Sequence, residues 1–112
     1  MLDPVAGRIE RYMDLLSARQ KLVASNIANA DTPGYKTRDL DFQTEFQARL
    51  EGLGPRVVEP AGLAARNDGN NVSLDRESRL LAENALRFSV ASQLLRAEVR
   101  AVRAAIQGGR NV

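Results

Sequence analysis

The sequence lacks cysteine, histidine and tryptophan, and only five of its 112 residues are aromatic. Without cysteine and histidine there can be no disulfide, zinc finger, cysteine nucleophile or histidine general base. The longest run of apolar residues is three residues, as at Leu80-Leu81-Ala82. A membrane-spanning helix needs about 20 such residues, and a secretory signal needs an apolar stretch of roughly 7–15. We therefore expect neither a membrane span nor a cleaved signal peptide.

The charged residues are nearly balanced, with 16 Lys and Arg against 14 Asp and Glu, which gives a net charge of +2. Apolar residues make up 44% of the chain and charged residues 27%, close to the averages for globular proteins. The length predicts a single small domain over 1–112. Fourteen of the cations are arginine, which favours fixed, bidentate contacts over loose solvation.

Apolar residues near both ends of the chain recur every seven positions, with alternating offsets of four and three. This pattern is typical of a helix with one narrow seam. It predicts a helix over about 3–30 and a longer one over about 73–107, which pair as a coiled-coil-like hairpin in an all-α fold. The rows are Leu2, Ile9, Leu16, Val23, Ala30 and Ala6, Met13, Gln20, Ile27, then Leu74, Leu81, Phe88, Leu95, Val102 and Ser78, Ala85, Ser92, Val99, Ile106. The predicted seam consists of Ile9, Met13, Leu16, Val23 and Ile27 and of Leu81, Phe88, Leu95, Val99 and Val102.

Capping residues support these boundaries. Pro4 suits a first helical turn. Pro33-Gly34 stops the first helix and fits the central positions of a type II turn. Ser73 is the expected N-cap of the last helix, and Gly108-Gly109 marks its expected end.

The middle of the chain, about 31–72, carries weaker patterns. Asp41 is expected to cap a short helix whose apolar residues, Phe42, Phe46 and Leu50, are spaced by four. Residues 52–71 are rich in glycine, proline and asparagine without clear periodicity, which predicts a mobile loop. Val57-Val58 before Asp68-Gly69 could also form half of a β-hairpin.

Two long helices with narrow seams can cover only each other, so a second apolar stripe is left uncovered on each. On the first helix this stripe includes Tyr12, Leu15 and Leu22, and on the last helix it includes Leu80 and Leu94. A chain of this size buries little surface, so a two-helix hairpin is marginal by itself. The pattern therefore indicates that another chain covers these side chains.

Few groups of residues suit catalysis. Asp39 and Asp41 are two positions apart, but we interpret them as a loop residue and a helix cap, because no third ligand or phosphate-binding glycine loop accompanies them. Asp68-Gly69-Asn70-Asn71 resembles the beginning of a calcium loop without its alternating ligands and final glutamate, and is interpreted as a turn. We expect no enzyme activity, cofactor, metal or small-molecule substrate.

Arginines form a stripe near the C-terminus. Arg96, Arg100 and Arg103 share a helix face, with Arg110 beyond them. Such a stripe could follow nucleic-acid phosphates or lie on an anionic membrane surface. Aromatic stacking residues and a DNA-reading turn are missing, so we interpret the stripe as a solvated or partner-facing edge and expect no nucleic acid.

The segment Ala24-Ser25-Asn26-Ile27-Ala28-Asn29-Ala30-Asp31-Thr32-Pro33-Gly34-Tyr35-Lys36 resembles the N-terminal signature of flagellar axial proteins, the rod and hook family of bacteria. We call seven of these residues the assembly motif: Asn26, Ala28, Asn29, Thr32, Pro33, Gly34 and Tyr35. Residues 38–42, 68–77 and 81–88 are similar to the proximal-rod branch of this family, so the resemblance spans nearly the whole chain.

The resemblance implies a structural subunit of the basal-body rod, which crosses the periplasm and transmits torque. It implies export by the flagellar type III apparatus without a cleaved signal peptide, and a position near the membrane ring and export gate. The implied partners are other proximal-rod proteins, the adaptor protein at the rod base and copies of the chain itself. The assembly motif is expected at subunit contacts. A small α-helical export adaptor or chaperone is the alternative.

Overall fold

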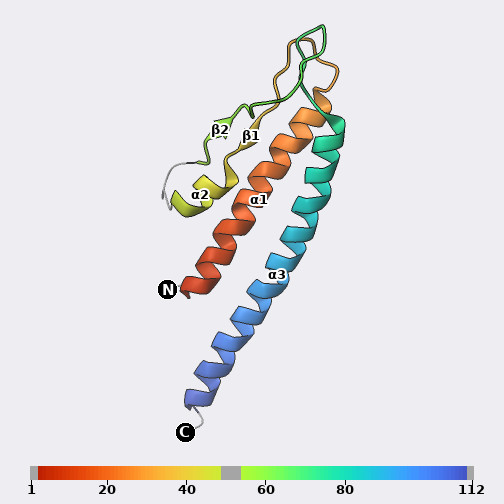
Figure 1. Ribbon diagram of the computed structural model, residues 1–112. Coiled ribbons are helices and arrows are strands. Elements are labelled where there is room, and N and C mark those ends of the chain that lie inside the picture. The colour runs from red at the N-terminus through yellow and green to blue at the C-terminus, as the bar shows by residue number, and fades with distance from the viewer. Residues whose placement is uncertain (1–2, 49–53, 111–112) are drawn as a thin grey trace.

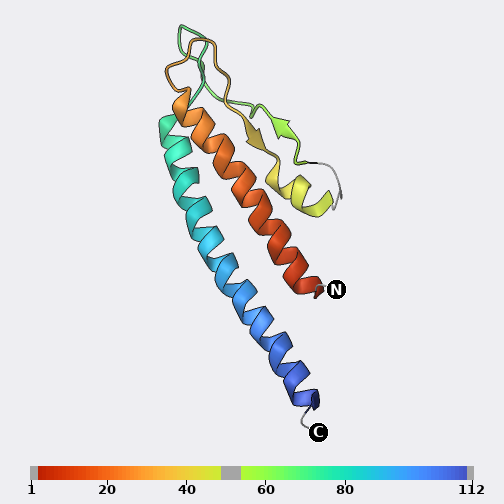
Figure 2. The ribbon, with the colours of Figure 1, turned by 180° about the vertical axis from the view of Figure 1, so that it is seen from behind.

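A computed structural model describes residues 3–48 and 54–110. Along the chain lie α1 (Pro4–Ala28), β1 (Asp39–Leu40), α2 (Phe42–Ala48), β2 (Val57–Val58) and α3 (Leu74–Arg110). The two long helices form an antiparallel hairpin, while α2 and the strands lie along the side of α1 away from α3 (Figures 1 and 2). The molecule measures 71 × 26 × 18 Å. This arrangement confirms the predicted fold class of paired long helices with a short helix between them.

Both ends of α1 are capped by side chains or by the turn that follows. At its start, the Asp3 carboxylate accepts a hydrogen bond from the N–H of Ala6 (3.3 Å), and Pro4 occupies the first turn as predicted. At its end, Asn29 is the C-cap, and its N–H donates to the carbonyl of Ser25 (3.0 Å). The helix therefore ends close to the predicted residue 30.

A tight turn follows over residues 32–35. The N–H of Tyr35 donates to the carbonyl of Thr32 (3.2 Å), and Gly34 has a φ of 75°. A type II turn requires positive φ at its third residue, which glycine adopts without steric cost. The predicted Pro33-Gly34 turn is confirmed.

The start of α3 is as predicted, but its end is not. The Ser73 hydroxyl accepts a hydrogen bond from the N–H of Arg76 (3.2 Å), which confirms the N-cap. The helix does not end at Gly108-Gly109 but continues to Arg110. A glycine ends a helix when it takes a left-handed conformation, and among the described glycines only Gly34, Gly62 and Gly69 have positive φ. Within a helix, glycine costs only about 1 kcal/mol relative to alanine.

The short helix α2 forms where it was predicted. The Asp41 carboxylate accepts hydrogen bonds from the N–H (3.4 Å) and hydroxyl (2.8 Å) of Thr44. Phe42 and Phe46 then pack edge-on against Tyr12 of α1, with ring centroids 5.4 and 5.7 Å apart. These contacts hold α2 on α1. Leu50, predicted as its third apolar residue, lies outside the described residues, as does Leu2.

The predicted irregular segment over 52–71 is confirmed for its described residues, apart from a two-residue strand and a turn that is fixed by hydrogen bonds. Strand β2 pairs antiparallel with β1, so that Val58 faces Asp39 and Val57 faces Leu40. Residues 66–72 are hydrogen-bonded to the turn after α1. Strands of two residues are too short to show the alternation by which strands are recognised in a sequence. The strand that pairs with Val57–Val58 is Asp39–Leu40, which comes before them in the chain. The possible hairpin required a pairing strand after the turn at Asp68-Gly69. Residues 52 and 53 lie outside the described part.

The predicted seam is correct for α1 but wrong for most of α3. In α1, Leu16 and Val23 are buried, and Ile9, Met13 and Ile27 are half-buried. In α3 the residues buried against α1 are Glu77, Leu80, Asn84 and Ala91, while the predicted Leu81, Phe88, Val99 and Val102 remain 37–41% exposed and Leu95 is half-buried.

Polar partners explain this difference. The inward row of α3 contains Glu77 and Asn84, whose side chains bond to Asn26 and Gln20 of α1. A search for apolar rows misses such positions. Leu80 and Leu15, expected on the outer stripes, are buried, Leu80 beside this inward row and Leu15 on the side of α1 that faces Glu45 and Pro55. Residues 99–109 are all exposed because α3 continues beyond the N-terminal end of α1 (Figure 1).

Candidate functional site

Polar side chains converge at the closed end of the hairpin, where α1 ends and α3 begins. We call this cluster the polar junction. It comes from α1, the segment leading to β1, and the first turn of α3, and its members are Arg19, Asn26, Tyr35, Asp39, Arg76 and Glu77.

Asn26 lies at the centre of the polar junction, and its side chain is fully buried. Its Nδ2 donates to the carbonyl of Arg38 (2.8 Å) and to Oε1 of Glu77 (2.7 Å). Its Oδ1 accepts from the hydroxyl of Tyr35 (2.9 Å) and from the N–H of Arg38 (3.1 Å). An amide offers two donor hydrogens and two acceptor sites, so every one is used. One side chain therefore joins three segments of the chain.

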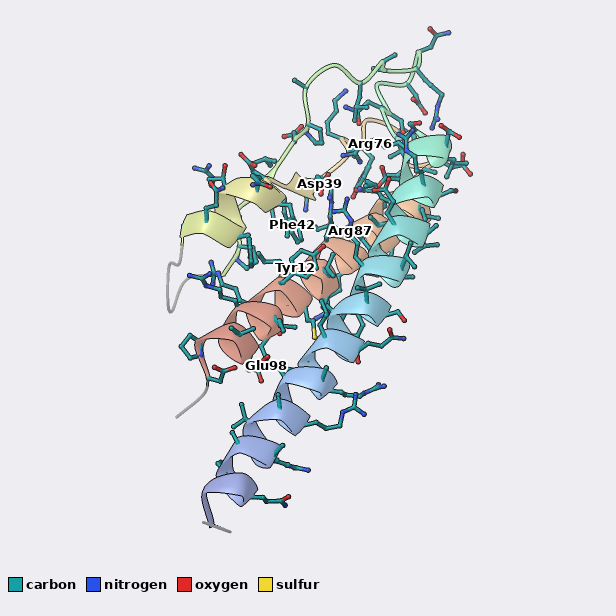
Figure 3. All side chains as sticks on the ribbon, turned by 60° about the horizontal axis from the view of Figure 1, so that its bottom comes forward. Tyr12, Asp39, Phe42, Arg76, Arg87 and Glu98 are labelled. Atoms are coloured by element: carbon teal, nitrogen blue, oxygen red, sulfur yellow. The ribbon has the colours of Figure 1, made fainter. Side chains whose placement is uncertain are left out.

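Asp39 forms a second connection through charge. Its two carboxylate oxygens accept hydrogen bonds from Nε and Nη2 of Arg19, both at 2.9 Å. Arg76 adds a third bond to Asp39 (2.5 Å) and also pairs with Glu77 (2.7 Å). Figure 3 shows Asp39 and Arg76 near each other beside the start of α3. The ion pairs thus run from α1 through β1 to α3 and meet the hydrogen bonds of Asn26 at Glu77.

The arginines shift the ionisation of Asp39. Burial by itself raises the pKa of this carboxyl, but the hydrogen bonds from Arg19, from the N–H of Leu40 and from Arg76, with the attraction of Arg19, outweigh it. The pKa of Asp39 therefore lies below its ordinary value. For Arg76, burial lowers the pKa, but Glu77 and Asp39 together raise it above its usual value. Both groups stay charged at neutral pH.

A second layer of hydrogen bonds fastens the turn at 66–72 to the end of α1. The fully buried Asn70 donates from Nδ2 to the carbonyls of Asn29 (2.9 Å) and Thr32 (2.8 Å). Asn71 accepts at Oδ1 from the N–H of Thr37 (2.7 Å). Residues 68–71, which resemble the beginning of a calcium loop in sequence, therefore belong to a turn that binds backbone groups.

The assembly motif divides into two groups by burial. Asn26 is buried, and Asn29 and Tyr35 are half-buried and bonded within the chain. The other members are exposed, namely Ala28, Thr32, Pro33 and Gly34. Contacts within one chain therefore account for the amides and the tyrosine, and leave an exposed surface on the same turn.

The sequence interpretation missed Asp39, which it treated as a loop residue, and missed the roles of Arg19, Arg76 and Glu77. One pattern could have revealed Glu77. Glu77, Asn84 and Ala91 are spaced by seven, in the register of a seam whose first two members are polar. Polar residues at consecutive positions of a seam register indicate buried partners rather than a solvated face.

In the described part of the chain, His, Cys, Asp and Glu residues form no group of three that could hold a metal ion. No helix among residues 3–48 and 54–110 is long and apolar enough to cross a membrane. Arg96, Arg100 and Arg103 are exposed on α3, as predicted for a solvated or partner-facing edge.

Known proteins similar to this chain match it over most of its length. The family model for "flagella basal body rod protein" matches residues 13–36. A protein of Yersinia enterocolitica named flagellar basal body rod protein FlgB is 30% identical, over 97% of this chain and all of its own length. This chain belongs to the flagellar basal body rod protein family. Proteins of the same name are 30% identical in Salmonella typhimurium, over 96% of both chains, and 38% identical in Cereibacter sphaeroides, over 84% of this chain and 87% of that one.

The residues matched by the rod protein family model include half of the polar junction. Residues 13–36 contain Arg19, Asn26 and Tyr35, together with the whole turn that Asn70 binds. The stretch that carries the family resemblance is therefore also the stretch that closes the hairpin. The chain is a structural protein of the flagellar rod, and its candidate functional site is the junction that joins its two long helices.

Replacing Asn26 with alanine should lower the free energy of unfolding by about 2–4 kcal/mol, because the buried Glu77 carboxylate and Arg38 backbone groups lose their partner. Urea denaturation followed by circular dichroism measures this change. The exposed Asn67 provides a matched control, and Asn67→Ala should stay within about 0.5 kcal/mol of the wild type. Equal effects of the two substitutions would contradict the central role of Asn26.

Asp39 should make the stability depend on pH in the acid range. Its folded pKa lies below the ordinary value of 3.8, so the ionised carboxylate stabilises the fold above that value. This contribution is lost as the pH falls through the folded pKa. Asp39→Asn should therefore cost about 2–3 kcal/mol at about pH 7 and less than about 1 kcal/mol at about pH 2.5. Urea titrations across this range, with the exposed Asp31→Asn as control, test the prediction; a constant difference would refute it.

Proposed function

We propose that this chain is a subunit of the proximal rod of the bacterial flagellar basal body. It packs there against copies of itself, against other proximal-rod proteins and against the adaptor protein at the rod base. It joins the membrane ring and export gate to the distal rod and transmits torque. It reaches this position through the flagellar type III export apparatus, without a cleaved signal peptide.

The observation that carries this proposal is an apolar row left exposed on α3. We call it the exposed row; it consists of Leu81, Phe88, Val99, Val102 and Ile106, which are 37–55% exposed. Two of these residues lie beside the inward row, and three lie on the part of α3 at and beyond the end of α1. Burying the remainder of each side chain contributes roughly 1 kcal/mol, so the row can offset a good part of the cost of association.

The free end of α3 supports the same proposal. From Val99 to Arg110 the helix runs for three turns with its side chains up to residue 109 exposed. Isolated helices shorter than about 12–15 residues are marginal in water. Packing against neighbouring subunits would stabilise this end. A surface that meets a different surface on the next subunit builds an open helical assembly, which is the geometry of a rod.

The exposed half of the assembly motif is the second surface that we assign to subunit contacts. Ala28 is exposed at the end of α1, and Thr32, Pro33 and Gly34 are exposed on the turn that follows, which Asn70 binds through the carbonyl of Thr32. The buried half then positions the exposed half. This division gives both groups of motif residues a role in rod assembly, one direct and one through the shape of the turn.

Electron microscopy of basal bodies from a strain lacking this gene, beside complemented cells, tests the proposal. We expect rings without rod or hook in the deletion strain, and complete basal bodies that contain the chain, by mass spectrometry, after complementation. Complete basal bodies in the deletion strain would refute a rod role. Absence of the chain from complemented basal bodies would favour the export adaptor or chaperone instead.

Ala28→Arg should separate assembly from folding. The side chain is exposed at the end of α1, so the free energy of unfolding should change by less than about 0.5 kcal/mol. The larger side chain should nevertheless block close approach of a neighbouring subunit and reduce swimming and incorporation into basal bodies. Ala64→Arg, at another exposed position, is the matched control. Normal motility with Ala28→Arg would remove this turn from the subunit contacts.

A further inference from the structure

A groove of about 470 Å³ lies between α1, α2 and α3, on the side of α3 away from the exposed row. Its apolar walls are formed by Ile9, Tyr12, Phe46, Leu86, Val90 and Leu94. We call it the arginine-flanked groove, because the two charged residues that line it among the described residues are Arg8 and Arg87. In Figure 3, Arg87 points from α3 toward the side on which Tyr12 lies.

The groove has the shape that accepts a helix. Leu86, Val90 and Leu94 follow one another at intervals of four residues, and they are 67%, 48% and 55% exposed. At 1.5 Å per residue this ridge is about 12 Å long, or roughly two helical turns. Helices bind such grooves by inserting apolar side chains spaced by three and four residues. Tyr12, held against Phe42 and Phe46, gives the opposite wall a fixed position.

The arginines indicate the charge of the occupant. Within the described chain, neither Arg8 nor Arg87 forms an ion pair. Guanidinium groups beside an apolar surface favour carboxylates, which they bind through two parallel hydrogen bonds. A second copy of the chain does not match, because its exposed row is accompanied on α3 by Arg96, Arg100 and Arg103.

On α3, acidic residues lie one turn beyond each end of the groove, Glu83 before Arg87 and Glu98 after Leu94. One turn beyond Leu94, the Glu98 carboxyl shares a hydrogen bond with Asp3, which raises the pKa of Glu98. This pair lies beside the first turn of α1 rather than between the two arginines. The positive part of the groove is therefore its middle, and the occupant needs its carboxylates there.

We propose that the arginine-flanked groove binds an amphipathic helix of a different protein, one whose apolar row is flanked by Asp or Glu. The inference rests on the proposed role in the rod, because it assigns one of the chain's unlike neighbours to a particular surface. The apolar row of the partner fills the space above Leu86, Val90 and Leu94. Its carboxylates bind Arg8 on one side and Arg87 on the other.

Two synthetic helical peptides of about 15 residues test the proposal on the full chain. Both carry leucines spaced by three and four, flanked by glutamate in one peptide and by lysine in the other. Fluorescence anisotropy should show the glutamate peptide binding at least about tenfold more tightly. Absence of binding, or equal affinity for both peptides, overturns the proposal.

Charge-reversal variants locate the binding. Arg8→Glu with Arg87→Glu should reverse the preference, whereas Arg100→Glu with Arg103→Glu, which changes the net charge equally, should preserve it. If the first pair disturbs folding, Arg8→Gln with Arg87→Gln should reduce the preference to less than about threefold. Equal effects of the groove pair and the control pair would overturn the proposal, because the preference would then follow net charge alone.

Two further measurements complete the test. Sedimentation of the chain alone tests whether a second copy occupies the groove. We expect that any self-association is unchanged by Val90→Asp. Self-association that Val90→Asp abolishes would identify the occupant as a second copy and overturn the proposal. In complemented cells, detection of the wild-type chain in purified basal bodies tests the rod role independently of the groove. If the wild type is incorporated and the Arg8→Glu, Arg87→Glu variant is incorporated equally well, only the groove proposal is lost. If the wild type is also absent, the rod role fails first.

Discussion

The amide of Asn26 is the contact on which the closed end of the hairpin depends. It is buried, and it bonds at once to Tyr35, to the backbone of Arg38 and to Glu77. A buried amide without partners costs several kcal/mol, so these groups must meet together or not at all. Because Glu77 is in the first turn of α3, this requirement also sets how α3 is rotated against α1.

The ion pairs of Asp39 extend this constraint to the rest of the middle segment. Arg19 and Arg76 hold Asp39 from opposite helices, and Asp39 begins β1. Strand β2 pairs with β1. Helix α2 follows β1 directly in the chain, and its Phe42 packs on Tyr12. A segment with little apolar content is thus placed by charge and hydrogen bonds at one end, and by two aromatic contacts at the other.

Several features that depend on neighbouring residues in the sequence were predicted correctly. The helix starts, the Pro33-Gly34 turn, the Asp41 cap and the α1 half of the seam all follow from spacing and capping residues. The α3 half of the seam could not be predicted in the same way, because Glu77 and Asn84 are polar and their partners lie 51 and 64 residues away. The same holds for Asp39, whose importance arises from two arginines brought together only by the fold.

The exposed row follows from the hydrogen bonds that Glu77 and Asn84 of α3 make with α1. Turning α3 by roughly 60° to bury Leu81 and Phe88 would move its side chains by about 6 Å, since a helix has a radius of about 5–6 Å. That movement would separate Glu77 from Asn26 and Asn84 from Gln20. Losing partners for a buried carboxylate and two amides costs more than the roughly 1 kcal/mol gained for each apolar side chain. The single chain therefore pairs Glu77 with Asn26 and the Nδ2 of Asn84 with Gln20, although Oδ1 of Asn84 stays without a partner, and it leaves apolar surface outside. That surface is the one we propose for contacts with neighbouring subunits.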